Sequence, residues 1–102
     1  MRIEFVRTGG LAGMRMATTV NTDSLPPDGA RVLRESVDAA RFFDLPPVIA
    51  SPTSGADRFQ YKITVEAEGR RHTVTVGEAA VPEALQPLIQ SLTTLARTAR
   101  SG

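Results

Sequence analysis

Few residues of this chain could perform catalysis. It has one histidine, His72, and no cysteine, which excludes a multi-histidine zinc site, a Cys-ligated zinc site and a disulfide framework. His72 falls on the core-facing side of an alternating segment, and nothing in the sequence places it beside a particular hydroxyl, as a Ser-His nucleophile requires. Three carboxylates, Asp44, Asp57 and Glu78, occupy predicted loop positions, but no neighbouring pattern marks one of them as a general acid. We therefore expect a protein that is not an enzyme and that has no cofactor and no metal of its own.

A glycine-rich segment superficially resembles a phosphate-binding loop. It consists of Gly9, Gly10, Leu11, Ala12 and Gly13. A phosphate-binding loop leads into the N-terminus of a helix and ends in Lys-Ser or Lys-Thr, whereas here a strand-like alternation follows. The segment is therefore predicted to be a hairpin loop, either a plain turn or a contact loop that exposes Leu11.

Length and charge restrict the remaining classes of protein. The chain has 102 residues and a formal net charge of +1, and 41% of its residues are hydrophobic. These values predict one globular domain spanning residues 1–102. The apolar runs are far too short for a membrane helix. The near-zero charge disfavours nucleic acid as a partner. No secretory signal is recognisable at the N-terminus, so we expect a cytoplasmic protein.

Two hairpins and two helices must position these residues. Alternation over residues 2–8 and from residue 14 to 20 predicts two strands around the glycine-rich loop. An apolar stripe then predicts a helix that ends near Asp44 and Leu45, because Pro46 and Pro47 cannot continue it. The stripe consists of Val32, Leu33, Val37, Ala40 and Phe43.

The second half of the chain repeats this order. Residues 59–66 alternate without fault and form a predicted hairpin with residues 71–76 through a tight turn at Glu68 and Gly69. Apolar residues between Leu85 and Ala96 then predict a second helix, which either kinks at Pro87 or begins just before it. The order β-β-α-β-β-α predicts an α+β two-layer sandwich, with a four-stranded antiparallel sheet and both helices on one face.

Four separated blocks of the chain together resemble the emfourin family. They are RIEFVR (2–7) followed by GGxAG (9–13), ARFFDLP (40–46), GADRFQYxITV (55–65) and HTV (72–74), where x is a position that does not count toward the match. The resemblance runs from Arg2 to about Leu95, and the specificity comes from the combination of segments. It implies a small bacterial inhibitor of thermolysin-like zinc metalloproteases, above all the protealysin-like enzymes. The implied partner is such a protease, bound 1:1 by a monomeric inhibitor.

The predicted topology suggests how such an inhibitor would act. If each element crosses the layer once, the loops at residues 8–13, 44–57 and 77–81 share one end of the sheet. A carboxylate can occupy the open position of a catalytic zinc, and the resemblance implies a protease pocket for a bulky apolar side chain. We therefore expect Asp57 to reach the protease zinc and Leu11 to fill the pocket. The flanking contacts are expected from Gly9, Gly10, Ala12, Gly13 and Ala56.

Other interpretations of the same residues stay open. Asp57 could instead be a turn residue that bonds nearby backbone N–H groups, and Asp44 and Glu78 are rival carboxylates at the same predicted end. At the level of function, one alternative is a regulatory or adaptor module that binds a partner other than a protease. The other is a nucleic-acid-binding module that uses arginines on the outer face of the sheet.

Overall fold

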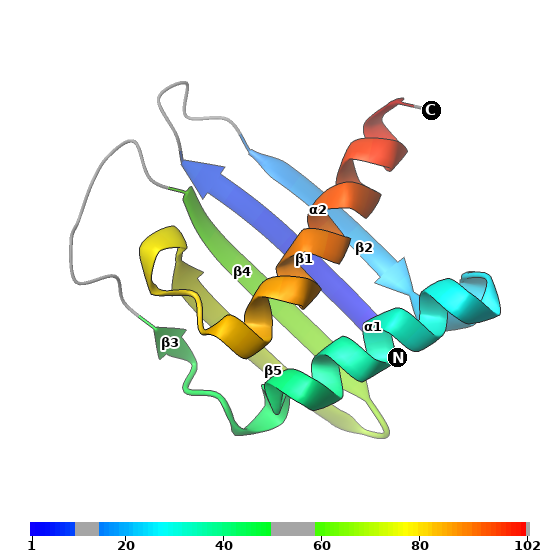
Figure 1. Ribbon diagram of the computed structural model, residues 1–102, viewed down its shortest axis with the longest axis horizontal. Helices are drawn as coiled ribbons and strands as arrows, with labels where there is room; N and C mark the ends of the chain where they lie inside the picture. The colour runs from blue at the N-terminus through cyan, green and yellow to red at the C-terminus, as the bar shows by residue number, and fades with distance from the viewer. Residues whose placement is uncertain (10–14, 50–58, 102) are drawn as a thin grey trace.

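The computed structural model describes residues 1–9, 15–49 and 59–101 of the chain. Its strands are β1 (Arg2–Gly9), β2 (Met16–Asn21), β3 (Val48–Ile49), β4 (Phe59–Ala67) and β5 (Arg70–Gly77). Its helices are α1 (Pro27–Ala40) and α2 (Gln86–Ser101), and short 3-10 turns join several elements. Figure 1 shows both helices lying across the same face of the sheet. The α+β class expected from the sequence is confirmed.

The sheet differs in detail from the expected four antiparallel strands. It has five strands in the order β2-β1-β4-β5-β3, and β3 pairs with β5 in parallel. The four longer strands are antiparallel, as predicted. The alternation pattern missed β3 because this strand has only two residues, directly after Pro46 and Pro47. Two residues cannot display a period of two.

The core lies between the sheet and the helices. The inward positions of the three central strands are fully buried: Ile3, Phe5, Ile63, Val65, Val74 and Val76. Leu33 and Val37 of α1 and Leu88 and Leu92 of α2 cover them. Burying one such side chain contributes about 1.5–3 kcal/mol, so this apolar layer is the main source of stability.

Helix α1 ends earlier than the sequence predicts. It stops at Ala40 because Arg41 adopts a left-handed backbone conformation, with φ 49°. The chain then turns sharply, and Phe42 enters the core with an exposed fraction of 1%. Phe43 consequently lies in a 3-10 turn instead of the helix, and Val32, expected to face the core, is 47% exposed.

The other local predictions agree with the structure. Glu68 and Gly69 both have positive φ, at 52° and 76°, which is the conformation of a tight two-residue hairpin turn. Helix α2 begins at Gln86, so Pro87 sits in its first turn and produces no kink. No helix in the described part of the chain is long and apolar enough to cross a bilayer.

Candidate functional site

The two segments predicted to contact a protease join the sheet at paired residues. Strand β1 ends at Gly9, strand β4 begins at Phe59, and these two residues are partners in the antiparallel β1–β4 ladder. Gly9 has φ 101°, which favours glycine as the chain leaves the strand. Of the predicted contact residues, only Gly9 is described. Gly10, Leu11, Ala12, Gly13, Ala56 and Asp57 lie outside the described residues.

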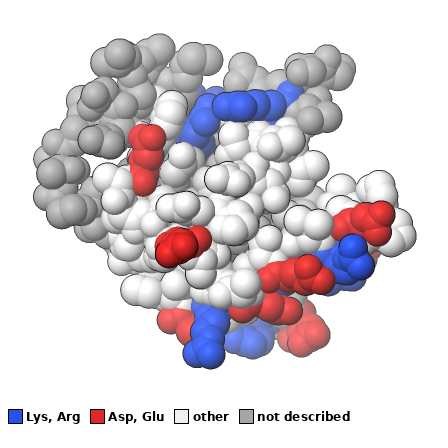
Figure 2. Space-filling view, viewed as in Figure 1, with Lys and Arg blue, Asp and Glu red and all other residues white. Residues whose placement is uncertain are grey.

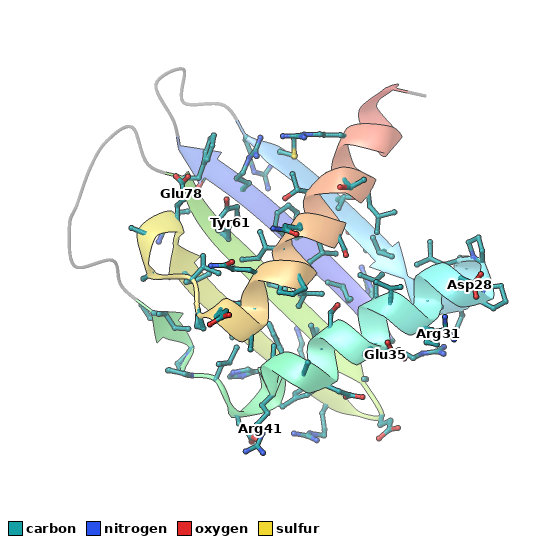
Figure 3. All side chains as sticks on the ribbon, in the orientation of Figure 1. Asp28, Arg31, Glu35, Arg41, Tyr61 and Glu78 are labelled. Carbon is teal, nitrogen blue, oxygen red and sulfur yellow. The ribbon has the colours of Figure 1, made fainter. Side chains whose placement is uncertain are left out.

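Glu78 fixes the start of β4. The backbone N–H of Phe59 donates a hydrogen bond to Glu78 Oε1 at 3.0 Å, although the two residues are 19 apart in sequence. Glu78 itself opens the 3-10 turn that follows β5. Figure 3 shows Glu78 at the start of β4, with Tyr61 just beside it. One carboxylate oxygen of Glu78 therefore holds the point at which the chain enters the sheet.

Aromatic and cationic side chains stiffen the same end of the sheet. The Arg7 guanidinium lies over the Phe59 ring, 4.3 Å from its centroid, and the Tyr61 and Phe5 rings stack with centroids 6.0 Å apart. Burial raises the pKa of Tyr61, the negative charge of Glu78 raises it further, and the positive charge of Arg7 opposes both. Sequence reasoning missed Arg7. The sequence does contain a signal for it: Arg7 falls on the same side of the β1 alternation as Ile3 and Phe5, and a charged residue on the core-facing side needs a partner.

Asp44 does not lie at the end of the sheet where Glu78 and Phe59 meet. Asp44 lies in the 3-10 turn Phe42–Asp44, beside Phe43, whose ring is covered by the Arg70 guanidinium at 4.2 Å. Arg70 begins β5 directly after the hairpin turn, at the opposite end of β4 from Phe59. Over the eight residues from Phe59 to Ala67, β4 spans about 27 Å. The expectation that Asp44 shares an end with Glu78 is therefore wrong.

The path of α1 explains this displacement. The prediction assumed that the helix runs back along the strands. Instead, α1 crosses the strand ends near the β4–β5 turn, as Figure 1 shows, and Arg34 and Asp38 line the same hollow as Ala67 and Glu68. The chain returns along the sheet only afterwards, as β3 beside β5.

His72 has structural partners. Its Nε2 lies 2.7 Å from the Leu45 carbonyl oxygen, and its ring meets the Phe42 ring edge-on at 5.7 Å. A His72 Nε2–H that donates to this carbonyl ties the chain after α1 to strand β5. Among residues 1–9, 15–49 and 59–101, no three His, Cys, Asp or Glu side chains gather as a metal would require.

The outer face of the sheet offers little to nucleic acid. Arg71 lies 3.8 Å from a Glu4 oxygen and 3.9 Å from a Glu66 oxygen, so carboxylates flank its charge. Tyr61 packs against the core, and Phe59, on the same side of β4, has the Arg7 guanidinium over its ring, so neither aromatic shares the outer face with Arg71. On the helical side, charges of both signs alternate along α1, where Arg31 lies near Asp28 and Glu35 (Figure 2).

These features define a small α+β fold in which the end of β1 and the start of β4 are paired at one end of the sheet. A family model described as Emfourin matches residues 5–93. The chain belongs to the Emfourin family. Membership of this family suggests a role as a protease inhibitor, which agrees with a protein that is not an enzyme. No curated protein and no solved structure matches the chain.

Proposed function

We propose that this protein inhibits thermolysin-like zinc metalloproteases, including protealysin-like enzymes, by occluding their active site with the segments around Leu11 and Asp57. The observation that carries the proposal is the pairing of Gly9 with Phe59, together with membership of the Emfourin family. Leu11 is two residues from Gly9 in sequence, and Asp57 is two residues from Phe59. Two residues span at most about 7 Å, so the backbone of each residue lies within that reach of the Gly9–Phe59 pair.

The chemistry of the target suits this pair of residues. A catalytic zinc keeps one position open, and a carboxylate oxygen binds zinc at about 2.0–2.2 Å. Asp57 supplies that oxygen in trans, and Leu11 fills the neighbouring apolar pocket of the protease. Gly9, Gly10, Ala12, Gly13 and Ala56 provide the small flanking residues that let the two segments approach a narrow cleft. Since neither segment offers its peptide bond as a substrate would, the inhibitor resists cleavage.

Glu78 is the rival zinc ligand at this end, and its hydrogen bond argues against that role. Its Oε1 already accepts the Phe59 N–H, which supports the entry of the chain into β4. A carboxylate used in this way positions its neighbours more readily than it inserts into a protease. We therefore assign Asp57 as the ligand and Glu78 as the brace.

The partner is expected to bind 1:1 with each inhibitor chain, in the cytoplasm of a bacterial cell, as the family resemblance implies. Titration against a thermolysin-like protease with a peptide substrate tests this directly. We expect a linear loss of activity that reaches zero near one equivalent. Intact activity against several such proteases, with the inhibitor folded, would overturn the proposal and favour an adaptor role.

The zinc-ligand assignment has its own test. Asp57→Ala should raise the inhibition constant by about two orders of magnitude or more, because breaking a charged contact at a buried interface typically costs at least 2–5 kcal/mol. Asp44→Ala is the matched control, since it removes an exposed carboxylate at the far end of the sheet. It should leave inhibition unchanged. Equal inhibition by the parent chain and the Asp57 variant would refute the assignment.

A further inference from the structure

The two edge strands of the sheet, β3 and β2, differ in length. At one edge, β3 pairs with β5, and the Thr75 N–H donates to the Pro47 carbonyl at 2.8 Å. At the other edge lies β2, and within the described residues no strand pairs with its outer side. Figure 1 shows β2 at this margin, with the second half of α2 lying over it.

The hydrogen-bond pattern identifies which β2 residues point outward. The Thr22 N–H donates to the Met1 carbonyl at 2.9 Å, and Arg2 is opposite Asn21. Bonded and non-bonded pairs alternate in an antiparallel ladder. Thr18 and Val20 therefore bond to β1, whereas Ala17, Thr19 and Asn21 direct their backbone N–H and C=O groups away from it. We call these three residues the free edge.

The free edge lacks the usual protection against strand pairing. Natural edge strands carry proline, lysine, inward charges or bulges. From Met16 to Asn21 the sequence is MATTVN, with no proline and no charged residue. The three residues of the free edge have small or short polar side chains, all exposed.

We propose that a second copy of this chain pairs with the free edge, through antiparallel β2 strands related by a two-fold axis at Thr19. In this register Thr19 faces Thr19 of the partner subunit, and Ala17 faces Asn21 of the partner subunit. All backbone groups of the free edge then find partners, and the two sheets become one continuous sheet of ten strands.

Charge complementarity favours this register. Arg15 is four residues before Thr19 and Asp23 is four residues after it. Arg15 directly precedes β2, and Asp23 lies in the 3-10 turn Thr22–Ser24 that follows it, so the two-fold axis brings Arg15 of each chain toward that turn of the partner subunit. Arg15 is exposed, and the Asp23 side chain is 76% exposed, with its nearest basic group, on Arg34, at 3.9 Å. Asp23 therefore already has one ion-pair partner, Arg34, and Arg15 of the partner subunit would meet the exposed remainder of its carboxylate.

The helical layer beside β2 also suits a second copy. A groove of about 510 Å³ opens between α1 and α2, and its apolar lining includes Leu25, Val32 and Leu95. The Val32 side chain is itself 47% exposed. A two-fold axis perpendicular to the sheet keeps both helical layers on one side, so the partner's helices approach this groove. A monomer, as expected from the sequence alone, would leave both the groove and the free edge open to water.

Single-cysteine variants test the register, because the described chain and its sequence contain no cysteine. Under oxidised glutathione, Thr19→Cys should form a covalent dimer, since bonded antiparallel partners have Cα atoms about 5.5 Å apart. Ala17→Cys is the control on the same face of the same strand. Its two copies would be separated by about 14 Å along the strand, beyond disulfide reach. Equal cross-linking of the two variants would overturn the proposed register.

Sedimentation velocity tests the association itself. We expect a concentration-dependent dimer that Arg15→Asp weakens about tenfold through two symmetric repulsive contacts. Asp23→Arg should weaken it similarly, and the double variant should restore it. Gln60→Lys, an exposed change on the central strand β4, should have no effect. A chain that stays monomeric at high micromolar concentration would refute the proposal. This holds also if a strand of a protease is later found to pair with the free edge.

Discussion

The hydrogen bond from Phe59 to Glu78 gives the sharpest prediction about the loop end of the sheet. Glu78 is exposed, so this 3.0 Å bond is worth about 1 kcal/mol. Residues 50–58 join the sheet at Phe59. Without the hydrogen bond to Glu78, Phe59 is held less firmly, and fixing it in the complex reduces the free energy of protease binding by about the same 1 kcal/mol. We expect Glu78→Ala to raise the inhibition constant about fivefold, since 1.4 kcal/mol corresponds to a factor of ten.

A second substitution separates bracing from zinc binding. Glu78→Gln keeps an acceptor oxygen for the Phe59 N–H but removes the charge. If Glu78 is a brace, this variant should inhibit almost as well as the parent. If Glu78 ligated the protease zinc, loss of the carboxylate would cost orders of magnitude. Both variants are titrated against the same protease with a peptide substrate, and their thermal unfolding is followed to confirm that each is folded.

The control is Glu83→Gln, which makes the same charge change in the 3-10 turn before α2. It should leave inhibition unchanged. The reasoning is refuted if Glu78→Gln and Glu78→Ala are equally damaging while both unfold like the parent. That result would mean that the carboxylate charge acts on the protease directly, and the roles of Glu78 and Asp57 would have to be exchanged.

Two further predictions concern the pH dependence and the core. Glu78→Gln should lower the pKa of Tyr61 but leave it above its ordinary value of 10.0, because burial is the larger cause of the shift. The chain has one tyrosine and no tryptophan, so the absorbance of tyrosinate measures the titration of Tyr61 alone. Folding raises the pKa of Tyr61, so the contribution of Tyr61 to stability is complete below its unfolded-state pKa and is lost as the pH rises through its folded-state pKa. The denaturant concentration at the unfolding midpoint should therefore fall over that alkaline range. An unchanged midpoint would contradict the linkage. Phe42→Ala should lower the free energy of unfolding by about 3–5 kcal/mol because Phe42 is 1% exposed. Val32→Ala, on the predicted stripe but 47% exposed, should change it by less than about 1 kcal/mol, and equal losses in denaturant unfolding would contradict the assignment of these side chains.

Elements with a long repeating pattern were predictable from the sequence. Residues 59–66 alternate over a whole strand, and the structure has β4 at Phe59–Ala67. The turn at Glu68 and Gly69 follows from the ability of glycine to adopt a positive φ. In both cases the local preference and the burial pattern agree, so no tertiary contact is needed to choose between alternatives.

The end of α1 was not predictable, for a physical reason. Helices commonly end with a left-handed residue, but glycine or asparagine usually occupies that position. Here Arg41 adopts the conformation, and burial of Phe42 against His72 offsets the steric cost. That compensation comes from a strand 30 residues later in the chain. A rule based on Pro46 and Pro47 therefore placed the boundary too late.

The position of the candidate site was predictable only in part. The assumption that each element crosses the layer once predicted that the segments after β1 and before β4 share one end, and the Gly9–Phe59 pair agrees with it, although the chain returns beside β5 as β3 and not as α1. The place of Asp44 depended on the direction of α1 over the sheet, which the order of elements leaves undetermined. The bond from Phe59 to Glu78 joins residues 19 apart and has no local signal.

The two proposals are compatible and can fail separately. The segments proposed to enter the protease leave the sheet near Met16, where β2 begins, because Met16 is opposite Arg7 of β1. Antiparallel pairing of two β2 strands places the two loop ends at opposite ends of the ten-stranded sheet. Each chain of the dimer can therefore hold its own protease, and the titration should end near one equivalent per chain with or without association. A Thr19→Cys dimer that titrates two proteases would support both ideas, whereas one that titrates a single protease would show that pairing at the free edge obstructs the site.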